Sequence, residues 1–169
     1  MALYPQLSSS QLDFLHTLTL FLTSVAQQHA QLLQAERPFH LRLSAYILCL
    51  SRAPDRELLK LCARFWQQWA TFLSRSFPRA SGGSAPEGDY SLLTQQVIEL
   101  LTQRMPRPEE VMMMENEDGE VVRVETRDTD GIALYKTMRE SFVLLAALDY
   151  EITEAILMHA LDLQVFFLP

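Results

Sequence analysis

The sequence predicts an all-α protein built from antiparallel helix pairs, on three observations. Apolar residues recur at three- and four-residue spacing through most of the chain, which is typical of amphipathic helices. Short links that contain proline, glycine or aspartate separate these stretches. A single region, 106–131, departs from the helical pattern. Helix pairs of this kind either close into a bundle or stack as a solenoid, and the spacing alone leaves both open.

Residues 1–77 are expected to form one helical repeat segment of about three helices. The first helix, over 9–34, has an apolar stripe made of Leu15, Leu18, Leu22, Val25 and Leu32. The second, over 39–52, has Leu43, Tyr46, Ile47 and Leu50 as its apolar positions. The third, over 53–76, begins with Pro54 and Asp55, which suit a first turn, and continues through Leu58, Leu61, Phe65, Trp69 and Phe72. Trp66 and Trp69 are predicted to pack in the core or between repeats.

Residues 78–88 are expected to form a flexible surface loop, because glycine, serine and proline dominate them. A second helical repeat segment is expected over 89–165. Asp89 is the predicted N-cap of its first helix, which ends before Pro106. Two further helices follow, split at Asp149 and Tyr150, and an acidic hairpin over 106–130 is inserted before them.

The net charge of the chain indicates which kinds of partner it can bind. The chain has 169 residues and a formal net charge of −7, which disfavours direct binding of nucleic acid and fits a basic protein partner. No stretch is long and apolar enough to predict insertion into a membrane, and no basic region resembling the start of a signal peptide precedes Arg37. The expected setting is the cytosol or the nucleus.

Catalytic and metal-binding patterns are not found in the sequence. Cys49 and Cys62 lack the close spacing of a metal or redox site, so both are predicted to be buried thiols. The four histidines are scattered, without a zinc-protease, nucleophile-elbow or phosphate-loop pattern around them. We therefore expect no catalytic residue, no metal and no cofactor, and the chain is not expected to be an enzyme.

The acidic segment is the most unusual feature of the sequence. It holds nine of the chain's 21 acidic residues: Glu109, Glu110, Glu115, Glu117, Asp118, Glu120, Glu125, Asp128 and Asp130. Residues 111–114 and 121–124 can form strands, and an Asp-Gly step between them favours a hairpin turn. One reading is a solvated insertion whose acids provide solubility. The other is an arm that presents a negative tip to a basic partner.

Two registers of this hairpin are compatible with the sequence. A two-residue turn at Asp118 and Gly119 would place Glu117 opposite Glu120. A four-residue loop would instead pair Met114 with Val121 and place Glu115 opposite Glu120. Both contain a like-charge pair, which costs stability, so the sequence does not choose between them.

The stretch from Arg104 to Ile156 resembles the exportin-1 family of nuclear export receptors, in the karyopherin superfamily. The order of features is the same: Arg-Met, Pro-Glu-Glu-Val, an apolar strand, Glu-Asn, Gly-Glu-Val-Val, Asp-Thr-Asp, Leu-Tyr-Lys, Met-Arg-Glu and Leu-Asp-Tyr. Residues 12–34 resemble the upstream helix of that family less distinctively. The resemblance implies an all-α, HEAT-repeat α-solenoid fragment with one inserted acidic β-hairpin loop.

The resemblance also implies a function for the hairpin. It would contact the GTPase Ran in its GTP-bound form and couple Ran binding to the state of the cargo groove. The acids expected to face Ran are Glu109, Glu110, Glu115, Glu117, Asp118 and Glu120. The residues expected to seat the hairpin on inner helices are Val111, Met112, Met113, Val121 and Val122. Asp128 and Asp130 are expected to help restart the next helix, with Asp130 or Thr129 as its N-cap.

Other functions of the family would depend on repeats outside this sequence. The groove for leucine-rich export signals and its reactive cysteine lie further along in the family, so cargo would bind only through downstream repeats. Nucleoporins are further candidate partners, and the expected localisation is the nucleus and the cytoplasm, with shuttling through the nuclear pore. The alternative function is that of a generic helical-repeat scaffold for protein–protein interaction.

Overall fold

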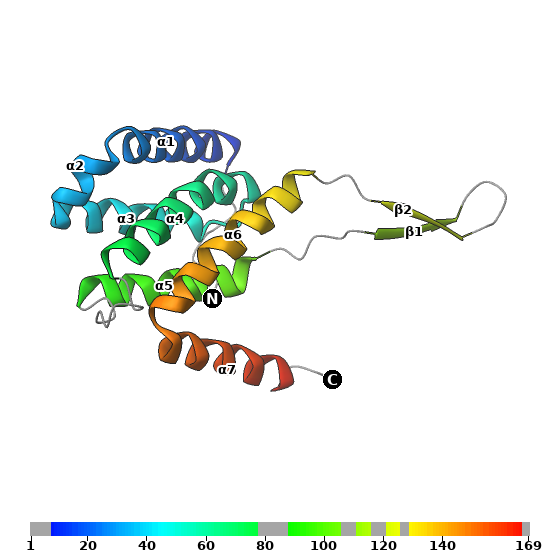
Figure 1. The fold of residues 1–169 in the computed structure, drawn as a ribbon. Helices are drawn as coiled ribbons and strands as arrows, with labels where there is room; N and C mark the ends of the chain where they lie inside the picture. The colour runs from blue at the N-terminus through cyan, green and yellow to red at the C-terminus, as the bar shows by residue number, and fades with distance from the viewer. Residues whose placement is uncertain (1–7, 78–87, 106–110, 116–120, 126–128, 167–169) are drawn as a thin grey trace.

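The structure is a computed structural model, and it describes residues 8–77, 88–105, 111–115, 121–125 and 129–166 of the chain. Figure 1 shows the helices gathered in one body and the two strands to one side of it. The elements are, in order, α1 (Ser9–Gln28), α2 (Ala30–Ala35), α3 (Arg37–Ser51), α4 (Arg56–Ser76), α5 (Asp89–Arg104), β1 (Val111–Glu115), β2 (Val121–Glu125), α6 (Thr129–Leu148) and α7 (Tyr150–Phe166).

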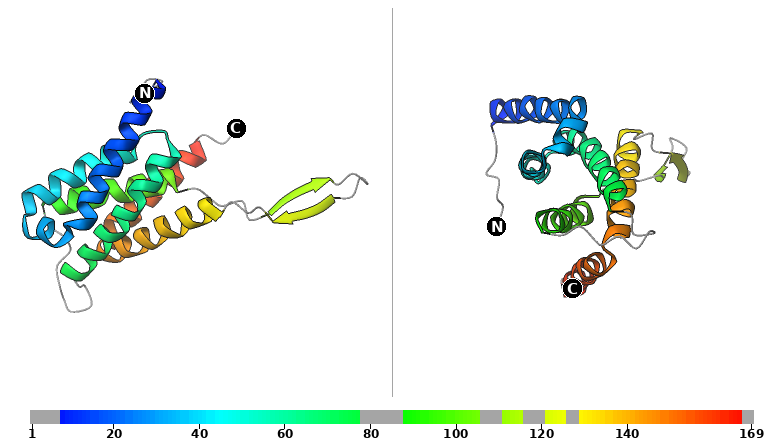
Figure 2. Two further views of the ribbon diagram at one scale, coloured as in Figure 1. Left: turned by 90° about the horizontal axis from the view of Figure 1, so that it is seen from above. Right: turned by 60° about the vertical axis from the view of Figure 1, so that its left-hand side comes forward.

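The helices form two layers (Figure 2, right). In one layer α4 packs between α1 and α6, and in the other α5 packs between α3 and α7. The two layers are joined where α3 packs on α4 and α5 packs on α6. Apart from the short α2, successive helices therefore alternate between the layers, as they do in stacked helix pairs, so the prediction of helix pairs is confirmed.

Side chains that accept backbone N–H groups fix several helix starts. Ser8 caps α1 in a capping box with Gln11, and the Asp55 carboxylate accepts the Leu58 N–H at 2.7 Å at the start of α4. The predicted split before Tyr150 is confirmed, because Asp149 accepts the Ile152 N–H at 3.1 Å and begins α7. Asp89 is not the N-cap of α5, however. That position belongs to Gly88 at φ 65°, a conformation that favours glycine, and Asp89 lies in the first turn.

The single helix predicted over 9–34 is wrong. The chain breaks at His29, where φ is −113° and ψ is 25°, and α2 begins at Ala30. The buried face runs through Thr19, Thr23, Ala26 and Leu33, whereas the predicted Leu32 is 68% exposed. In α1 the most buried positions include Thr19 and Thr23, whose hydroxyls donate to the Leu15 and Thr19 carbonyls. These internal hydrogen bonds allow polar side chains to occupy an apolar interface.

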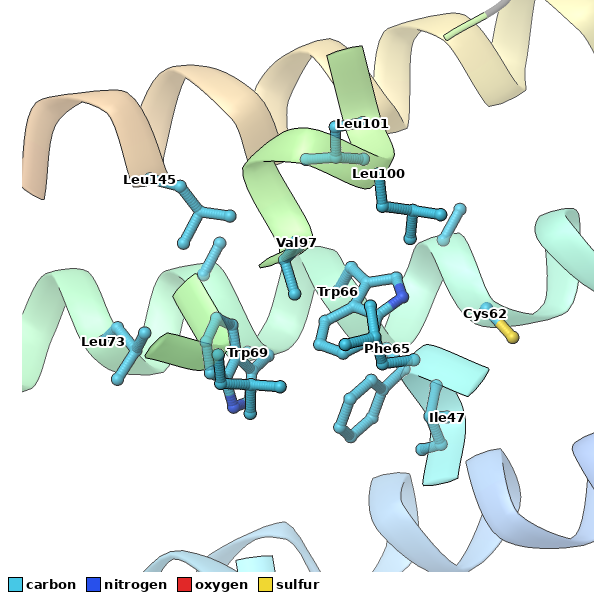
Figure 3. Close-up of a cluster of buried hydrophobic side chains, with 14 of the residues drawn as sticks. Ile47, Cys62, Phe65, Trp66, Trp69, Leu73, Val97, Leu100, Leu101 and Leu145 are labelled. Carbon is cyan, nitrogen blue, oxygen red and sulfur yellow. The ribbon is translucent and has the colours of Figure 1, made fainter. Parts of the chain in front are cut away.

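The core is built around the two tryptophans of α4 (Figure 3). Trp66 and Trp69 are buried and meet edge to face, with ring centroids 5.6 Å apart, so the prediction that they pack in the core is confirmed. Residues of α3, α5 and α6 surround them, among them Ile47, Val97, Leu101 and Leu145. Of the predicted apolar positions, Leu43, Ile47, Leu58, Phe65 and Trp69 are buried and most of the others are half-buried. Leu32 is exposed, and Tyr46 is 66% exposed.

A buried polar node joins α3 to α4. The Ser51 hydroxyl donates to the Ile47 carbonyl at 2.7 Å and accepts the Trp66 indole N–H at 2.9 Å. Burial raises the pKa of the neighbouring Cys62 thiol to about 11, against a smaller opposing effect of a hydrogen bond with Ser51, so this thiol is not a nucleophile at neutral pH. The prediction of burial is confirmed for Cys62 and wrong for Cys49, which lies on the exposed side of α3.

A second buried contact joins α3 to α5. His40 is buried, its Nδ1 lies 3.1 Å from the Tyr90 hydroxyl, and its ring meets Phe72 edge to face at 5.2 Å. Arg37 lies over the opposite side of this cluster, 5.0 Å from the Tyr90 ring centroid. Burial lowers the pKa of His40 below its ordinary value of 6.5, because the interior disfavours the charged imidazolium.

Lowering the pH should therefore destabilise this junction. As the pH falls from about 7.5 to about 5.5, the unfolded state binds a proton at position 40 that the folded state resists, so the free energy of unfolding decreases. Thermal unfolding across this range should show the decrease, and His40→Gln should reduce it. His29→Gln is the matched control, because His29 is exposed on the break between α1 and α2. An equal pH dependence in both variants would contradict the assignment to His40.

The two strands pair antiparallel, with Val111 opposite Glu125, Met113 opposite Arg123 and Glu115 opposite Val121. This register is neither of the two considered from the sequence. It is shifted by one residue from each, because five residues connect the strands in place of two or four. The shift puts Val121 opposite Glu115 and so avoids the opposed glutamates that both predicted registers contained. The connecting residues, 116–120, lie outside the described part of the chain.

Candidate partner-binding surface

The root of the inserted segment is tied to the preceding helix pair at both ends. Where α5 ends, Arg104 donates to the Arg52 carbonyl at 3.4 Å, at the end of α3, and Met105 packs partly buried against the core. Where α6 begins, Asp130 lies 3.0 Å from the Lys60 ammonium of α4. The positions at which the segment leaves and re-enters the helical body are thus held by contacts with α3 and α4.

Lys60 is the centre of this second contact. Its ammonium also lies 3.1 Å from Glu57, one turn earlier on α4. Hydrogen bonds to Asp130 and then Glu57 raise the pKa of Lys60, because both carboxylates favour the charged ammonium. The two carboxylates are exposed, so these ion pairs orient the start of α6 on α4 and add little to the free energy of unfolding. Thr129 and Asp130 lie in the first turn of α6, which begins at Thr129, so the prediction that one of them is the N-cap is wrong.

Of the six acids predicted to face Ran, the structure describes only Glu115. Glu115 ends β1, and its Cα partner is Val121. Glu109, Glu110, Glu117, Asp118 and Glu120 lie outside the described residues. The predicted seating residues Val111, Met112, Met113, Val121 and Val122 lie in the strands, but their side chains are outside the described part. Figure 1 shows the strand pair apart from the helices, so seating on inner helices stays a prediction.

Sequence reasoning missed the basic residues of α4 and α6. Arg64, Arg75, Lys136 and Arg139 are exposed and line three adjoining grooves along these two helices. The signal was present, because Lys60 and Arg64 are four residues apart and Lys136 and Arg139 are three apart, spacings that place side chains on one helical face. The net charge of −7 indicates an acidic surface, so it gives no sign of a local basic one.

The described residues offer little for metal or membrane binding. Within the described ranges, no group of three or more His, Cys, Asp or Glu side chains could hold a metal ion. None of the described helices combines the length and the apolar character that crossing a bilayer requires. Two of the described histidines have polar neighbours: His40 contacts Tyr90, and the His16 ring lies 3.1 Å from Asp55.

These features define an α-helical repeat protein of the HEAT type that carries a strand pair inserted between the helices of one repeat. Comparison with known proteins identifies which repeat protein it resembles. Residues 87–153, which include α5, the strand pair, α6 and the start of α7, match the family described as CRM1 / Exportin repeat 2.

The chain belongs to the exportin-1 family. It is 32% identical over 156 residues to Exportin-1 of Dictyostelium discoideum and 31% identical over 160 residues to Exportin-1 of Drosophila melanogaster, with 89% of this chain covered in each case. It is 29% identical over 181 residues to Exportin-1 of Schizosaccharomyces pombe, with 91% covered. The matches span 15%, 15% and 17% of these relatives, respectively, so the chain corresponds to a small part of their length.

Proposed function

We propose that this chain is a segment of a nuclear export receptor, and that its inserted acidic hairpin contacts Ran in the GTP-bound form. The observation that supports this most strongly is the paired strand segment between α5 and α6, inside the region that matches the exportin repeat. The strands stand apart from the helices (Figure 1), and the sequence around them is strongly acidic. A projecting acidic segment complements a basic protein surface.

The contact would be made by Glu109, Glu110, Glu115, Glu117, Asp118 and Glu120. Exposed carboxylates add modest energy each, so recognition would depend on several acting together and on their attraction to a basic partner at long range. Val111, Met112, Met113, Val121 and Val122 would seat the strand pair on helices when Ran is bound or released. Flexible methionine side chains suit packing against more than one surface.

The hairpin would also link Ran to cargo. Its root is held by the Lys60–Asp130 and Arg104–Arg52 contacts, so a change in hairpin position would act on α4 and on the end of α3. In the proposed receptor, Ran would bind on one side of the hairpin, and other repeats would form the export-signal groove on its other side. Binding at either place would shift the position of the hairpin. Leucine-rich cargo and Ran-GTP would then bind cooperatively, and loss of Ran would release the cargo. Receptors of this kind shuttle between the nucleus and the cytoplasm and meet nucleoporins on the way.

Charge reversal tests the Ran contact. In the triple variant Glu115→Lys, Glu117→Lys and Asp118→Lys, affinity for Ran-GTP should fall by about tenfold or more at low salt, because attraction becomes repulsion at three positions. The loss should shrink at high salt, where exposed charges are screened. Isothermal titration calorimetry or surface plasmon resonance against immobilised Ran-GTP measures both effects.

A matched control separates a local contact from a change in total charge. The control variant has Glu151→Lys, Glu154→Lys and Asp162→Lys, which alter the same number of exposed acids, all on α7. Its affinity for Ran-GTP should stay within about twofold of the original, because salt screens charges that lie far from the contact. An equal loss of affinity in both variants would show that binding depends only on the net charge of the chain. Binding of basic proteins regardless of the nucleotide on Ran would favour the alternative of a generic helical-repeat scaffold.

A further inference from the structure

The face formed by α4 and α6 is a second charged surface, distinct from the hairpin. Three adjoining grooves run along it, and each neighbouring pair shares lining residues. Gln27 lines the first two grooves, and Gln67 and Thr71 line the second and the third. Figure 2 shows these three helices side by side in one layer. We call this surface the cationic face, defined by its exposed basic residues Arg64, Arg75, Lys136 and Arg139.

The charges on the cationic face are unbalanced. Five basic side chains line the grooves, Lys60 and the four of the cationic face, against three acids, Glu57, Asp130 and Glu140. Glu57 and Asp130 both contact Lys60, and Glu140 accepts a hydrogen bond from the Gln67 amide at 2.6 Å. Among the described residues, none of the four basic side chains has an ion-pair partner. An acidic protein thus has a net excess of positive charge along these grooves, which attracts anionic groups.

The polar groups between these charges suit a polypeptide backbone. Gln27, Gln34, Gln67 and Gln68 line the grooves with Thr71, and their side chains can both donate and accept hydrogen bonds. Arginine guanidinium groups pair with carboxylates through two parallel hydrogen bonds, so Arg64, Arg75 and Arg139 can orient acidic side chains as well as attract them. Exposed Val143 and half-buried Leu144 add a small apolar strip beside Arg139.

The length of the face sets the size of its ligand. Arg64 and Arg75 are eleven positions apart on α4, or about 16 Å along the helix axis at ~1.5 Å per residue. An extended peptide rises ~3.3 Å per residue, so about five of its residues span this distance. A nucleic acid is disfavoured, because the remaining surface of a chain with net charge −7 repels a continuous polyanion.

We propose that the cationic face binds an extended acidic peptide segment of a partner protein, with carboxylates on Arg64, Lys136, Arg139 and Arg75 and the backbone along the glutamine-lined grooves. This surface uses α4 and α6 and none of the hairpin acids. Its test is therefore independent of the Ran contact, and either proposal can fail while the other holds.

Fluorescence anisotropy tests the proposal with a labelled peptide of about twelve residues, in which glutamate alternates with leucine and which is long enough to span the face. The same peptide with glutamine in place of glutamate is the uncharged probe. The acidic peptide should bind, the uncharged one should bind at least about tenfold more weakly, and the difference should shrink as salt is raised. No binding of the acidic peptide at low salt would overturn the proposal.

Matched variants then locate the site. Lys136→Glu with Arg139→Glu should weaken binding of the acidic peptide by about tenfold, because both charges on one groove reverse. Arg42→Glu with Arg52→Glu makes the same change in net charge on two exposed residues, one in α3 and one at its C-cap, in the other layer. It should leave binding within about twofold. Thermal unfolding of both variants verifies that they fold.

Two results would contradict the site. Equal weakening by the α3 control would show that only total charge matters. A single-stranded oligonucleotide that binds as tightly as the peptide, with the same sensitivity to Lys136→Glu and Arg139→Glu, would show a general polyanion surface and overturn the assignment to a peptide.

Discussion

Replacing Trp66 with alanine should lower the free energy of unfolding by about 3–5 kcal/mol, the cost typical of removing a buried aromatic side chain. Trp66 is 1% exposed and lies where residues of α3, α4 and α5 converge (Figure 3). The substitution removes apolar contacts, leaves a cavity, and takes away the N–H that donates to Ser51. Urea unfolding followed by circular dichroism measures the loss, and a change below about 1 kcal/mol would contradict this packing.

A pair of tryptophan-to-phenylalanine substitutions separates packing from hydrogen bonding. Trp66 and Trp69 lie on the same helix, are nearly equally buried and contact each other. The Trp66 N–H donates to Ser51, whereas the buried Trp69 N–H has no hydrogen-bond partner among the described residues. Trp66→Phe loses a hydrogen bond, and Trp69→Phe removes an unsatisfied donor. Trp66→Phe should therefore be more destabilising by about 1–2 kcal/mol. Equal costs would contradict the assigned hydrogen bonds.

The sequence predicted helices well where local signals decide them. Asp149 marked the split before α7 because an aspartate side chain can cap the next helix wherever it lies in the fold. The tryptophans were placed in the core because their large apolar surface has few other stable locations. Both signals are read from a few neighbouring residues, and tertiary contacts reinforced them.

The wrong predictions came from positions that tertiary contacts decide. The burial of His40 was not predicted, because its polar partner, the Tyr90 hydroxyl of α5, lies fifty residues away in the sequence. In the first two helices the buried positions, Thr19, Thr23, Ala26 and Leu33, each lie one residue after a predicted apolar position. The two threonines can be buried because their hydroxyls donate to carbonyls of their own helix. The strand register depends on the number of residues that connect the strands, which is five, and the predicted turns had two or four.

Of the two candidate sites, one could be predicted from the sequence and the other could not. The acidic segment was found from composition alone, because nine acids in so short a stretch are visible in one dimension. The cationic face was not, because its residues come from α4 and α6, which are far apart in the sequence and meet only in the folded layer. Lys60 and Asp130, seventy residues apart, form the link between the two sites.

Replacing Asp55 with alanine should lower the free energy of unfolding by about 0.5–2 kcal/mol, the range measured for lost N-caps. The carboxylate holds the first turn of α4 through the Leu58 N–H at 2.7 Å and lies 3.1 Å from the His16 ring of α1. Because α4 packs against α1, α3 and α6, loosening its start affects the whole helical body. Asp55→Asn is the matched control, since asparagine caps helices as well as aspartate does and should retain most of the stability.

The pH dependence of the stability difference between the original chain and Asp55→Asn tests whether the charge of the Asp55 carboxylate matters. Partial burial raises the pKa of Asp55, but hydrogen bonds from the Leu58 N–H and from His16 outweigh it, so the pKa lies below its ordinary value of 3.8. A lowered folded-state pKa means that the ionised group stabilises the protein above pH 3.8 and that this stabilisation is lost as the pH falls through the folded-state pKa. The advantage of the original chain over Asp55→Asn should therefore shrink in acid, in a range separate from that of His40. An advantage that stays constant down to the acid unfolding transition would assign the stabilisation to side-chain shape instead of charge.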